Sequence, residues 1–355
     1  MQLNLVAPIN TTSYGIASTN ILIALQNLGV EVSLFPISGM ECDPDKTENI
    51  QVALGLAKKP NFQAPSLRIF HQNLLAEHVS STLRIGFPIF ELDKFSEIEK
   101  HHLSNQDRLF VCSDWAKEII SRNGIDTPTH VVPLGIDRTI FNENVLPTTL
   151  PGGPNTYRFF NCGKIEIRKG HDLLVHMFNE AFTPEDDVAL IISWQNRFMT
   201  EKENEEWIRY YKNSKLGDKI HFVPWVKNPS ELASVMAACD CGVFPTRCEG
   251  WGLPILEMLS IGKKVITTRY SGHTQYVNDI NSSLVNVVDG EMAVDGKWFF
   301  GQGQWARIGE VEFKAFVRYM SQHKTYNSRG NKFGIETAKE FSWENTAQSI
   351  IKGLV

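Results

Sequence analysis

Two glutamates enclose a run of glycine, proline and apolar residues in the stretch EGWGLPILE, from Glu249 to Glu257. Pro254 fits the first turn of a helix, where its missing N–H costs nothing, so a helix is expected to begin near Leu253. Glu249 then lies in the loop before the helix, and Glu257 lies about one turn inside it. The two carboxyl groups therefore do not share a helical face, and each needs a role of its own.

The residues between the glutamates suit an anion. Gly250 and Gly252 allow the backbone to approach a ligand closely, and the unpaired amides at a helix start favour negative charge. This pattern predicts a phosphate-binding turn. A plainer alternative stays open, in which Glu257 only complements the helix dipole and Glu249 is a solvated loop acid.

A second loop carries three cations. In NCGKIEIRKGHDLL a strand is expected to end at Gly163, and Lys164, Arg168 and Lys169 follow before the next helix. Cations at the carboxyl edge of a sheet can hold a diphosphate through charge-assisted hydrogen bonds. The alternative is a basic turn that only water contacts.

The elements that position these loops alternate along the chain. Short buried strands are followed by segments with helical spacing, which predicts parallel sheets in an α/β layer structure. The predicted strands include LNLVAP (3–8), EVSLFP (31–36), RFFNCG (158–163), VALIISW (188–194) and CGVFPT (241–246). The glycine-rich aromatic segment 288–309 has no clear period and is expected to be a loop excursion.

Residues 142–157 concentrate Pro, Gly, Thr and Asn, which is the composition of a linker. We therefore predict an N-terminal domain over 1–148, a second α/β domain over 149–335 and a C-terminal helical segment over 336–355 that packs back on the first domain. A ligand is expected at the carboxyl ends of the strands and between the two domains.

Composition excludes several classes of protein. The chain has 355 residues, 42% of them hydrophobic and 21% charged, with a net charge of -5, so it should fold and has no global positive field for nucleic acid. No apolar run approaches the roughly 20 residues of a membrane span. The six cysteines are expected to be reduced core thiols of a cytoplasmic protein, and none of the spacings predicts a metal site.

The stretches above resemble blocks of the GT-B retaining glycosyltransferases of family 4. GKIEIRKG resembles the Gly-Arg-x4-Lys-Gly block and EGWGLPILE resembles the Glu-x7-Glu block. VVPLGIDRTIF (131–141) and VKNPSELASVMAACDCGVFPTRCEG (226–250) resemble two further blocks, and all four occur in the family's order. The resemblance implies two Rossmann-like domains facing a central cleft, the first on the acceptor side and the second binding a nucleotide-sugar donor.

The resemblance also implies roles at the donor. Lys164, where the family usually has Arg, and Lys169 would contact the donor diphosphate, while Glu249 would face the transferred sugar and Glu257 would accept hydrogen bonds from the ribose. The remaining donor-binding positions that it implies are Gly15, Gly163, Arg168, Trp225, Val226, Lys227, Gly250, Trp251, Gly252, Leu253 and Pro254. Of these, residues 225–227 match the place where the family holds the nucleobase.

On the acceptor side, Ser13, Tyr14 and Gly15 match the loop after the first strand. GFPIFELDKFS places Glu91 and Asp93 where other members have a catalytic-site histidine, so Glu91 joins Glu249, Lys164 and Lys169 as a candidate catalytic residue. Whether Glu91 or Asp93 takes the place of that histidine stays open.

Two further residues belong to this comparison. His71, at the end of a predicted strand, is a further acceptor-side candidate. Gln275 stands near a position where many relatives have a glutamate.

The implied chemistry is retaining sugar transfer. Lys164, Lys169 and helix-start amides would stabilise the leaving diphosphate, so no divalent metal or other cofactor would be obligatory. By resemblance, reaction on one face of the sugar would let the departing phosphate take the acceptor proton, and Glu249 would orient sugar hydroxyls. A UDP- or GDP-sugar is the expected donor; the acceptor, whether glycan, lipid-linked sugar, protein or small molecule, is not encoded in a readable way.

The sequence bears on four other classes of protein. A metal-dependent GT-A enzyme would use Asp43-Pro44-Asp45, which lies in a polar stretch beyond any clear strand end. A nicotinamide oxidoreductase requires Gly-x-Gly-x-x-Gly after the first strand, and PINTTSYGIA lacks it. A nucleotide-sugar-binding protein with weak or no catalysis, and a GT-B phosphorylase, remain open alternatives.

Overall fold

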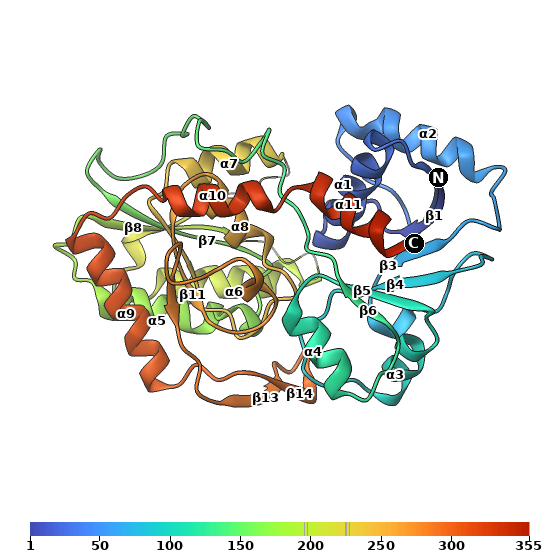
Figure 1. Cartoon of the computed structure of the whole chain (residues 1–355). Coiled ribbons are helices and arrows are strands. Elements are labelled where there is room, and N and C mark those ends of the chain that lie inside the picture. The colour runs from blue at the N-terminus through green and yellow to red at the C-terminus, as the bar shows by residue number, and fades with distance from the viewer. Residues whose placement is uncertain (195, 197, 224–225, 227, 355) are drawn as a thin grey trace. The chain divides into compact units, whose positions relative to one another are not determined.

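A computed structural model describes residues 1–194, 196, 198–223, 226 and 228–354. The chain divides into two compact units. Unit 1 comprises Met1–Gly135 together with Glu340–Val355, and unit 2 comprises Ile136–Lys339. Each unit is an α/β body built on its own parallel sheet (Figure 1).

Unit 1 contains a six-stranded parallel sheet in the order β2-β1-β3-β4-β5-β6. Its strands are β1 (Gln2–Ala7), β2 (Glu31–Pro36), β3 (Ser66–Ile69), β4 (Arg84–Phe87), β5 (Arg108–Val111) and β6 (Thr129–Val131). Its helices are α1 (Ser13–Asn27), α2 (Thr47–Ala57), α3 (Glu97–Ser104), α4 (Asp114–Arg122) and α11 (Trp343–Leu354). Figure 1 shows α1, α2 and α11 on one face of the sheet and α3 and α4 on the other.

Unit 2 also contains a six-stranded parallel sheet, in the order β12-β11-β10-β7-β8-β9. Its strands are β7 (Tyr157–Gly163), β8 (Val188–Trp194), β9 (Ile220–Phe222), β10 (Cys241–Phe244), β11 (Lys264–Thr268) and β12 (Ser283–Val285). Its helices are α5 (His171–Ala181), α6 (Glu201–Lys212), α7 (Pro229–Ala237), α8 (Leu253–Ser260), α9 (Glu310–Thr325) and α10 (Lys332–Glu340). In Figure 1, α5, α6 and α9 cover one face of this sheet and α7, α8 and α10 cover the other.

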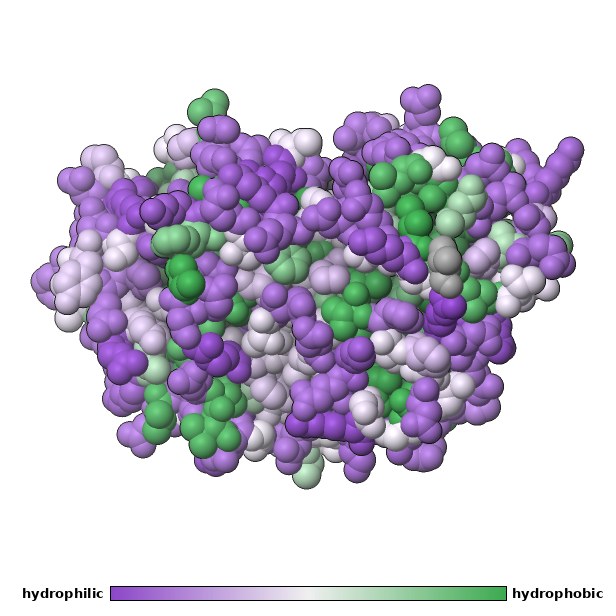
Figure 2. Space-filling view, in the orientation of Figure 1, coloured by the Kyte–Doolittle hydropathy of each residue, from purple (hydrophilic) through white to green (hydrophobic). Residues whose placement is uncertain are grey.

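The core of unit 2 lies between its sheet and the helices α5 and α9. Phe159 on β7 and Phe178 on α5 are fully buried, and Phe182 packs against both at ring-centroid distances of 5.4 Å. Burying a side chain of this size stabilises the fold by about 1.5–3 kcal/mol. On the face that Figure 2 shows, hydrophilic residues predominate, as expected when the apolar strands are covered on both sides by helices.

The predicted α/β class is confirmed, with two parallel sheets in series. Several details differ from the expectations. Residues 288–309 are not a plain loop, because β13 (Gly290–Val294) and β14 (Phe300–Ala306) form an antiparallel hairpin. Ser13, Tyr14 and Gly15 form the first turn of α1 rather than a loop.

The division into units falls after Gly135, before the stretch that was predicted to be a linker. Residues after Ile136 stay with unit 2 because their backbone is tied to it. Thr148 N, for example, donates to Ser234 O at 3.1 Å. The helix α11 belongs to unit 1, where its residue Thr346 donates to Pro133 O at 2.8 Å.

Candidate active site

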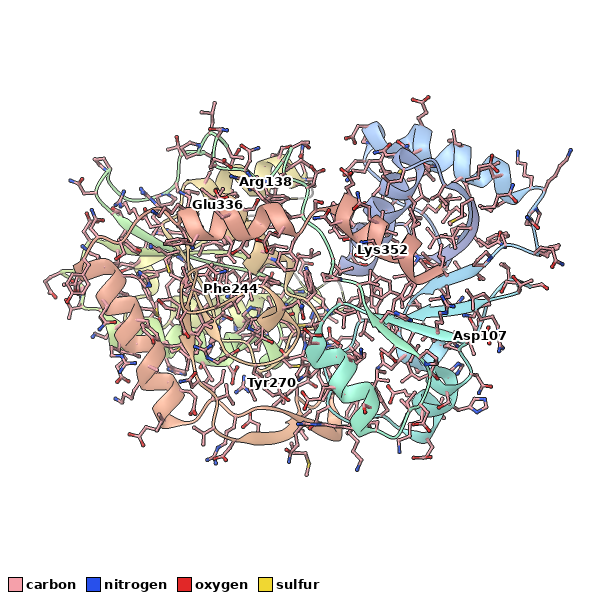
Figure 3. All side chains as sticks on the ribbon, viewed as in Figure 1. Asp107, Arg138, Phe244, Tyr270, Glu336 and Lys352 are labelled. Carbon is pink, nitrogen blue, oxygen red and sulfur yellow. The ribbon has the colours of Figure 1, made fainter. Side chains whose placement is uncertain are left out.

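The predicted donor residues of unit 2 gather at one point of its sheet. Counted along the chain, the strand order is the doubly wound 3-2-1-4-5-6, so the order reverses between β7 and β10. Open α/β sheets bind ligands at this reversal, outside the carboxyl ends of the strands. Lys164 and Lys169 follow β7, and Glu249 follows β10, whose last residue Phe244 is labelled in Figure 3.

Glu249 is held by two cations. Lys169 Nζ donates to Glu249 Oε1 at 2.6 Å, and Arg168 Nη1 donates to Oε2 at 3.2 Å. Burial alone would raise the pKa of this carboxyl, but the attraction of Lys169 and Arg168 outweighs burial and lowers the pKa to about 2. The group is therefore a firmly ionised carboxylate and a weak base at neutral pH.

Neighbouring loops fix the backbone of Glu249. Its amide donates to Ser271 Oγ at 2.8 Å, and its carbonyl accepts from Gly272 N at 2.9 Å. A Cβ at Gly272 would lie 1.9 Å from Gly250 O, so only glycine fits there. Ser271 and Gly272 follow β11, and thus the neighbouring strand end also positions this turn.

Arg247 links the same turn to two other elements. Its guanidinium donates to both carboxylate oxygens of Asp172 on α5, at 2.8 and 2.9 Å, and to Glu291 on β13 at 2.7 Å. Its amide donates to Arg168 O at 2.7 Å, which joins the β7 and β10 loops directly. The hairpin that was expected to be a loop therefore supports the candidate active site.

The helix α8 begins at Leu253, as predicted, with Pro254 in its first turn. Gly252 precedes it with φ of +83°, a left-handed conformation that side chains disfavour. Tyr276 Oη lies 2.7 Å from Gly252 O and 2.8 Å from Trp251 O, and this hydrogen bonding stabilises the turn before α8. The arrangement leaves a helix start beside Glu249, which is suited to an anion.

Glu257 is different from Glu249. Its carboxyl is buried, and no hydrogen bond or ion pair joins its side chain to any residue that the structure describes. Burial raises its pKa to about 8. A buried carboxyl without a partner among the described residues can accept hydrogen bonds from a ligand.

The three cations after β7 have carboxylate partners. Arg168 is buried and donates to Glu166 Oε2 at 2.8 Å, and Lys164 Nζ lies 2.8 Å from Glu166 Oε1. Burial would raise the pKa of Glu166, but Arg168, Lys164 and Lys169 lower it on balance. The Lys164 side chain stays 45% exposed and can therefore reorient towards a ligand, which buried Arg168 cannot.

A buried polar network behind these loops was not predicted. Asn161 Oδ1 accepts from Trp194 Nε1 at 2.9 Å and lies 3.0 Å from His171 Nε2. His171 Nδ1 accepts from Glu166 N at 3.0 Å, so the proton of the neutral ring is on Nε2. Burial lowers the pKa of His171 to about 3, so the ring is uncharged at neutral pH. Its hydrogen bonds to Glu166 N and Asn161 fix the position of the loop that carries the cations.

A small hollow lies in front of this network. It is lined by Asn161, Cys162, Lys169, His171, Phe244, Thr246, Glu249, Gly252, Pro254 and Ile255. The list combines the end of β7, the end of β10 and the start of α8. Gly163 has a φ of +123°, which allows the chain to change direction at the end of β7. The Lys169 side chain packs against Gly163, and its Cε would lie 3.4 Å from a Cβ added there.

The predicted acceptor-side residues lie in unit 1. Its strand order reverses between β1 and β3, and Tyr14 after β1 meets His71 after β3 with ring centroids 4.7 Å apart. Tyr14 Oη donates to Ile89 O at 2.6 Å and accepts from Ile89 N at 3.0 Å. Burial and the charge of Glu91 raise the pKa of Tyr14 well above its usual value.

The other unit 1 candidates differ in exposure from one another. Ser13 and His71 are exposed, while Glu91 and Asp93 are partly buried. A Cβ at Gly15 would lie 2.2 Å from Asn10 O, so glycine is required in the first turn of α1. Asp93 O accepts from Asn123 Nδ2 at 3.0 Å, which anchors the segment that carries both acids.

Some predicted positions give no geometry. Trp225 and Lys227 lie outside the described residues, and Val226 between them is partly buried. Asp43 precedes a short 3₁₀ turn, Pro44–Lys46, and Asp45 lies within it. Within the described ranges, no group of three His, Cys, Asp or Glu side chains could hold a metal ion, and no helix is long and apolar enough to cross a membrane.

Comparison with known proteins decides the fold. The chain is 16% identical to sucrose-phosphate synthase from Thermosynechococcus elongatus, with a TM-score of 0.67 and coverage of 99% of this chain and 98% of that one. Anabaena Alr3699/HepE in complex with UDP and glucose also gives a TM-score of 0.67 at 16% identity, over 100% and 99% of the two chains. The fold is GT-B.

Residues 151–294 match the family model described as "Glycosyl transferases group 1". This range contains both loops of the candidate active site. The match covers less than half of the chain and indicates a glycosyltransferase of group 1 for that part. The predicted class of protein is therefore supported at this level.

Curated relatives are distant. The D-inositol 3-phosphate glycosyltransferase of Arthrobacter sp. is 25% identical over 238 residues, 65% of this chain and 51% of that protein. The O-antigen biosynthesis glycosyltransferase WclY of Escherichia coli is 31% identical over 108 residues, 30% and 27% of the two chains. A GDP-mannose-dependent alpha-(1-6)-phosphatidylinositol dimannoside mannosyltransferase of Mycobacterium tuberculosis is 23% identical over 177 residues, 49% and 44%. The chain thus spans between about a quarter and a half of the length of these relatives.

Proposed function

We propose that the protein is a retaining glycosyltransferase that moves a sugar from a nucleotide-diphosphate sugar to an acceptor hydroxyl without an obligatory metal ion. One observation carries this proposal. Arg168 and Glu249, which are buried, and Lys169, which is partly buried, form a charged cluster at the sheet reversal of unit 2, beside the start of α8. Such a cluster offers fixed positive charge to a leaving diphosphate and a fixed carboxylate to a sugar.

The reaction divides charge between two places. The bond from the anomeric carbon to the phosphate oxygen breaks, and its electron pair stays on that oxygen. Lys169 Nζ can donate to this oxygen while it keeps its bond to Glu249, because an ammonium has three protons. Lys164 and the α8 amides add further stabilisation, and one such preorganised donor is worth about 3–4 kcal/mol in a dry site.

The other half of the reaction forms the new bond on the same face of the sugar. The acceptor oxygen attacks the anomeric carbon, and its proton goes to the departing phosphate oxygen. Glu249 is a poor candidate for base or nucleophile, since its pKa near 2 leaves it little affinity for a proton or for carbon. We assign it to the sugar hydroxyls and to the positive charge that develops on the ring.

The remaining roles follow from the other contacts. Glu257 has an unfilled carboxyl that can accept hydrogen bonds from the donor ribose. Residues Ser13, Tyr14, His71, Glu91 and Asp93 are assigned to the acceptor side. A UDP-sugar or GDP-sugar fits best, because HepE is described in complex with UDP-glucose and the mycobacterial relative is GDP-mannose-dependent. The six cysteines are all free, which supports a cytoplasmic setting.

The first test is a panel of UDP-, GDP- and ADP-sugars with thermal shift and slow donor hydrolysis as readouts. One donor should stabilise the protein by about 2.7 kcal/mol at 100 times its dissociation constant. The same donor should release free sugar with its anomeric configuration kept, as followed by proton NMR, and EDTA should not slow the release.

Each other result has a distinct meaning. Stabilisation without any hydrolysis would indicate a nucleotide-sugar-binding protein rather than an enzyme. Inverted product would contradict the retaining mechanism, and loss of activity in EDTA would contradict metal independence. No response to any sugar nucleotide would contradict the proposed function itself.

A further inference from the structure

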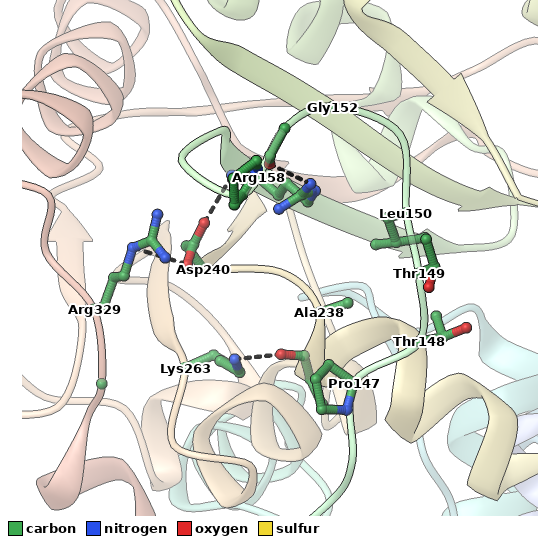
Figure 4. Close-up of a pocket in the computed structure, with 14 residues that line it drawn as sticks. Pro147, Thr148, Thr149, Leu150, Gly152, Arg158, Ala238, Asp240, Lys263 and Arg329 are labelled. Atoms are coloured by element: carbon green, nitrogen blue, oxygen red, sulfur yellow. Dashed lines mark hydrogen bonds and ion pairs between the residues drawn. The ribbon is translucent and has the colours of Figure 1, made fainter.

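A second hollow lies in unit 2 at the opposite edge of the sheet. It has a volume of about 480 Å³ and is enclosed by the loop 147–154, the end of α7 and the amino ends of β7, β10 and β11 (Figure 4). The lining residues that can contact a ligand through polar side chains are Thr148, Thr149, Arg158, Asp240, Lys263 and Arg329. The predicted functional residues do not include any of them.

The charges of this hollow are unbalanced. Arg158, Lys263 and Arg329 are cations, and Asp240 is the one carboxylate among the lining residues. Figure 4 shows Arg158, Asp240 and Lys263 around the hollow, with Arg329 at one margin and the loop 147–152 at the other. Arg329 Nε lies 3.3 Å from Asp240 Oδ1. The Arg158 amide donates to Asp240 Oδ2 at 2.9 Å, so this carboxylate is already engaged on both oxygens.

Lys263 and Arg329 have N–H groups that can donate to a ligand, whereas Arg158 donates to the loop. Arg158 donates to Pro151 O at 3.1 Å and Gly153 O at 2.9 Å and so holds the loop closed. Lys263 Nζ has one described partner, Ala237 O, and Arg329 uses Nε while its terminal nitrogens have no partner within the described part of the chain. Burial lowers the pKa of Lys263, Asp240 opposes this shift and the charge of Arg329 adds to it. The positive charges of Lys263 and Arg329 repel each other, and an anion bound between them would offset that repulsion.

This hollow is separate from the candidate active site. Arg158 is near the start of β7, and Gly163 is at its end. A strand rises by about 3.3 Å per residue, so Arg158 and Gly163 are roughly 17 Å apart along β7. A ligand in one hollow therefore does not reach the other.

We propose that the hollow at the amino ends of β7, β10 and β11 binds a small phosphate monoester. The phosphate lies between Lys263 and Arg329, where charge-assisted donors from two elements converge on it. A volume of about 480 Å³ exceeds the need of a bare phosphate and falls in the range of small-molecule sites. Thr148 and Thr149, on the exposed loop, provide hydroxyl groups for a polar organic part.

The test is isothermal titration calorimetry of the whole protein with glucose 6-phosphate, glycerol 3-phosphate and AMP, and with glucose and inorganic phosphate as comparison ligands. At least one monoester should bind more tightly than inorganic phosphate, and glucose should not bind. Arg329→Gln and Lys263→Gln should each weaken that binding at least tenfold. Arg318→Gln, an exposed arginine on α9, is the matched control and should leave it unchanged.

Two further arms separate this hollow from the candidate active site. Binding should persist in Lys169→Met and in saturating UDP or GDP. If Lys169→Met weakened monoester binding and Arg329→Gln did not, the phosphate would bind at the candidate active site, and the proposal would be overturned. The absence of binding by all three monoesters would overturn it as well.

Discussion

Each of the two parallel sheets has a point where its strand order reverses, and the residues at the two reversals differ in chemistry. In unit 2 the residues at the reversal are charged, buried and paired, as in Lys169 with Glu249 and Arg168 with Glu166. In unit 1 the corresponding residues are the rings of Tyr14 and His71 with two nearby acids, and His71 is exposed. A doubly wound sheet thus provides only the place, and the loops determine what is done there.

The difference indicates a division of labour. Fixed charge in a buried setting acts strongly on a developing negative charge, because little solvent screens it. The aromatic rings of Tyr14, which is partly buried, and His71, which is exposed, provide apolar and stacking surface and carry no fixed charge. Under the proposed function, damage to the unit 2 reversal should affect the chemical step, and damage to the unit 1 reversal should affect stability or acceptor use.

The largest effect is expected for Lys169→Met. Methionine keeps much of the side-chain length but removes the ammonium from the leaving group and from Glu249. The expected loss in kcat for donor hydrolysis is about 10²–10³-fold, the range found when one preorganised donor is removed. Lys164→Met is the comparison, and its loss should be smaller because the half-exposed Lys164 is less strongly shielded from solvent. Equal losses would mean that burial does not set the strength of these cations.

A moderate effect is expected for the pH dependence of donor binding. The Glu257 carboxyl is protonated below its pKa of about 8 in the free protein, and ribose hydroxyls would donate best to its ionised form. Donor affinity should therefore rise about tenfold between pH 6.5 and 8.5 and then level off. Glu257→Gln should bind more weakly and lose this rise, as measured by calorimetry across the same pH range. An unchanged pH profile in the variant would exclude Glu257 as its source.

The raised pKa of Glu257 also predicts that its contribution to stability falls as pH rises, whereas donor affinity is expected to rise. A pKa raised in the folded state means that Glu257 favours folding below about pH 4.5, and this contribution is lost as pH rises through about 8. The melting temperature of Glu257→Gln relative to the natural chain should therefore increase from pH 5 to pH 8.5. A constant difference would show that the buried carboxyl finds a partner in solution.

The smallest effect is expected in unit 1. Tyr14→Phe removes the two hydrogen bonds that the phenol hydroxyl makes with the N–H and the carbonyl of Ile89. Leaving these two backbone groups unpaired should lower the free energy of unfolding by about 1–3 kcal/mol. Tyr326→Phe, whose ring is exposed, should be close to neutral. Thermal or urea unfolding measures both. A large loss of donor hydrolysis in Tyr14→Phe would contradict the separation between the two reversals.

Local sequence patterns predicted much of the fold. The buried strands and the helix start at Leu253 follow from runs of apolar residues and from Pro254, which act over a few positions. The hairpin β13–β14 was missed because its outer face carries exposed Met292 and Val294 beside buried Ala293. Apolar residues on both faces remove the alternation by which a half-buried strand is recognised.

The candidate site was predicted less completely than the fold. Its charged loops were found because each follows a strand end within a few residues. Its supports were not, because Ser271, Asp172 and Glu291 approach Glu249 or Arg247 only in the folded chain. Glu166 was not predicted as a site residue, although it forms ion pairs with two of the three cations in its loop, Lys164 and Arg168. Pairing of this kind depends on distances that sequence spacing does not give.

The most direct test of the central claim is Glu249→Gln with two readouts on one preparation. Glutamine keeps the size of the side chain but removes the charge that Lys169 and Arg168 hold in place. We predict that sugar transfer and donor hydrolysis fall by at least about 10²-fold while nucleotide diphosphate binds within a few fold of its affinity for the natural protein. Full activity in this variant, or a loss of nucleotide affinity as large as the loss of activity, would contradict the assignment of Glu249 to the sugar and of the cations to the leaving group.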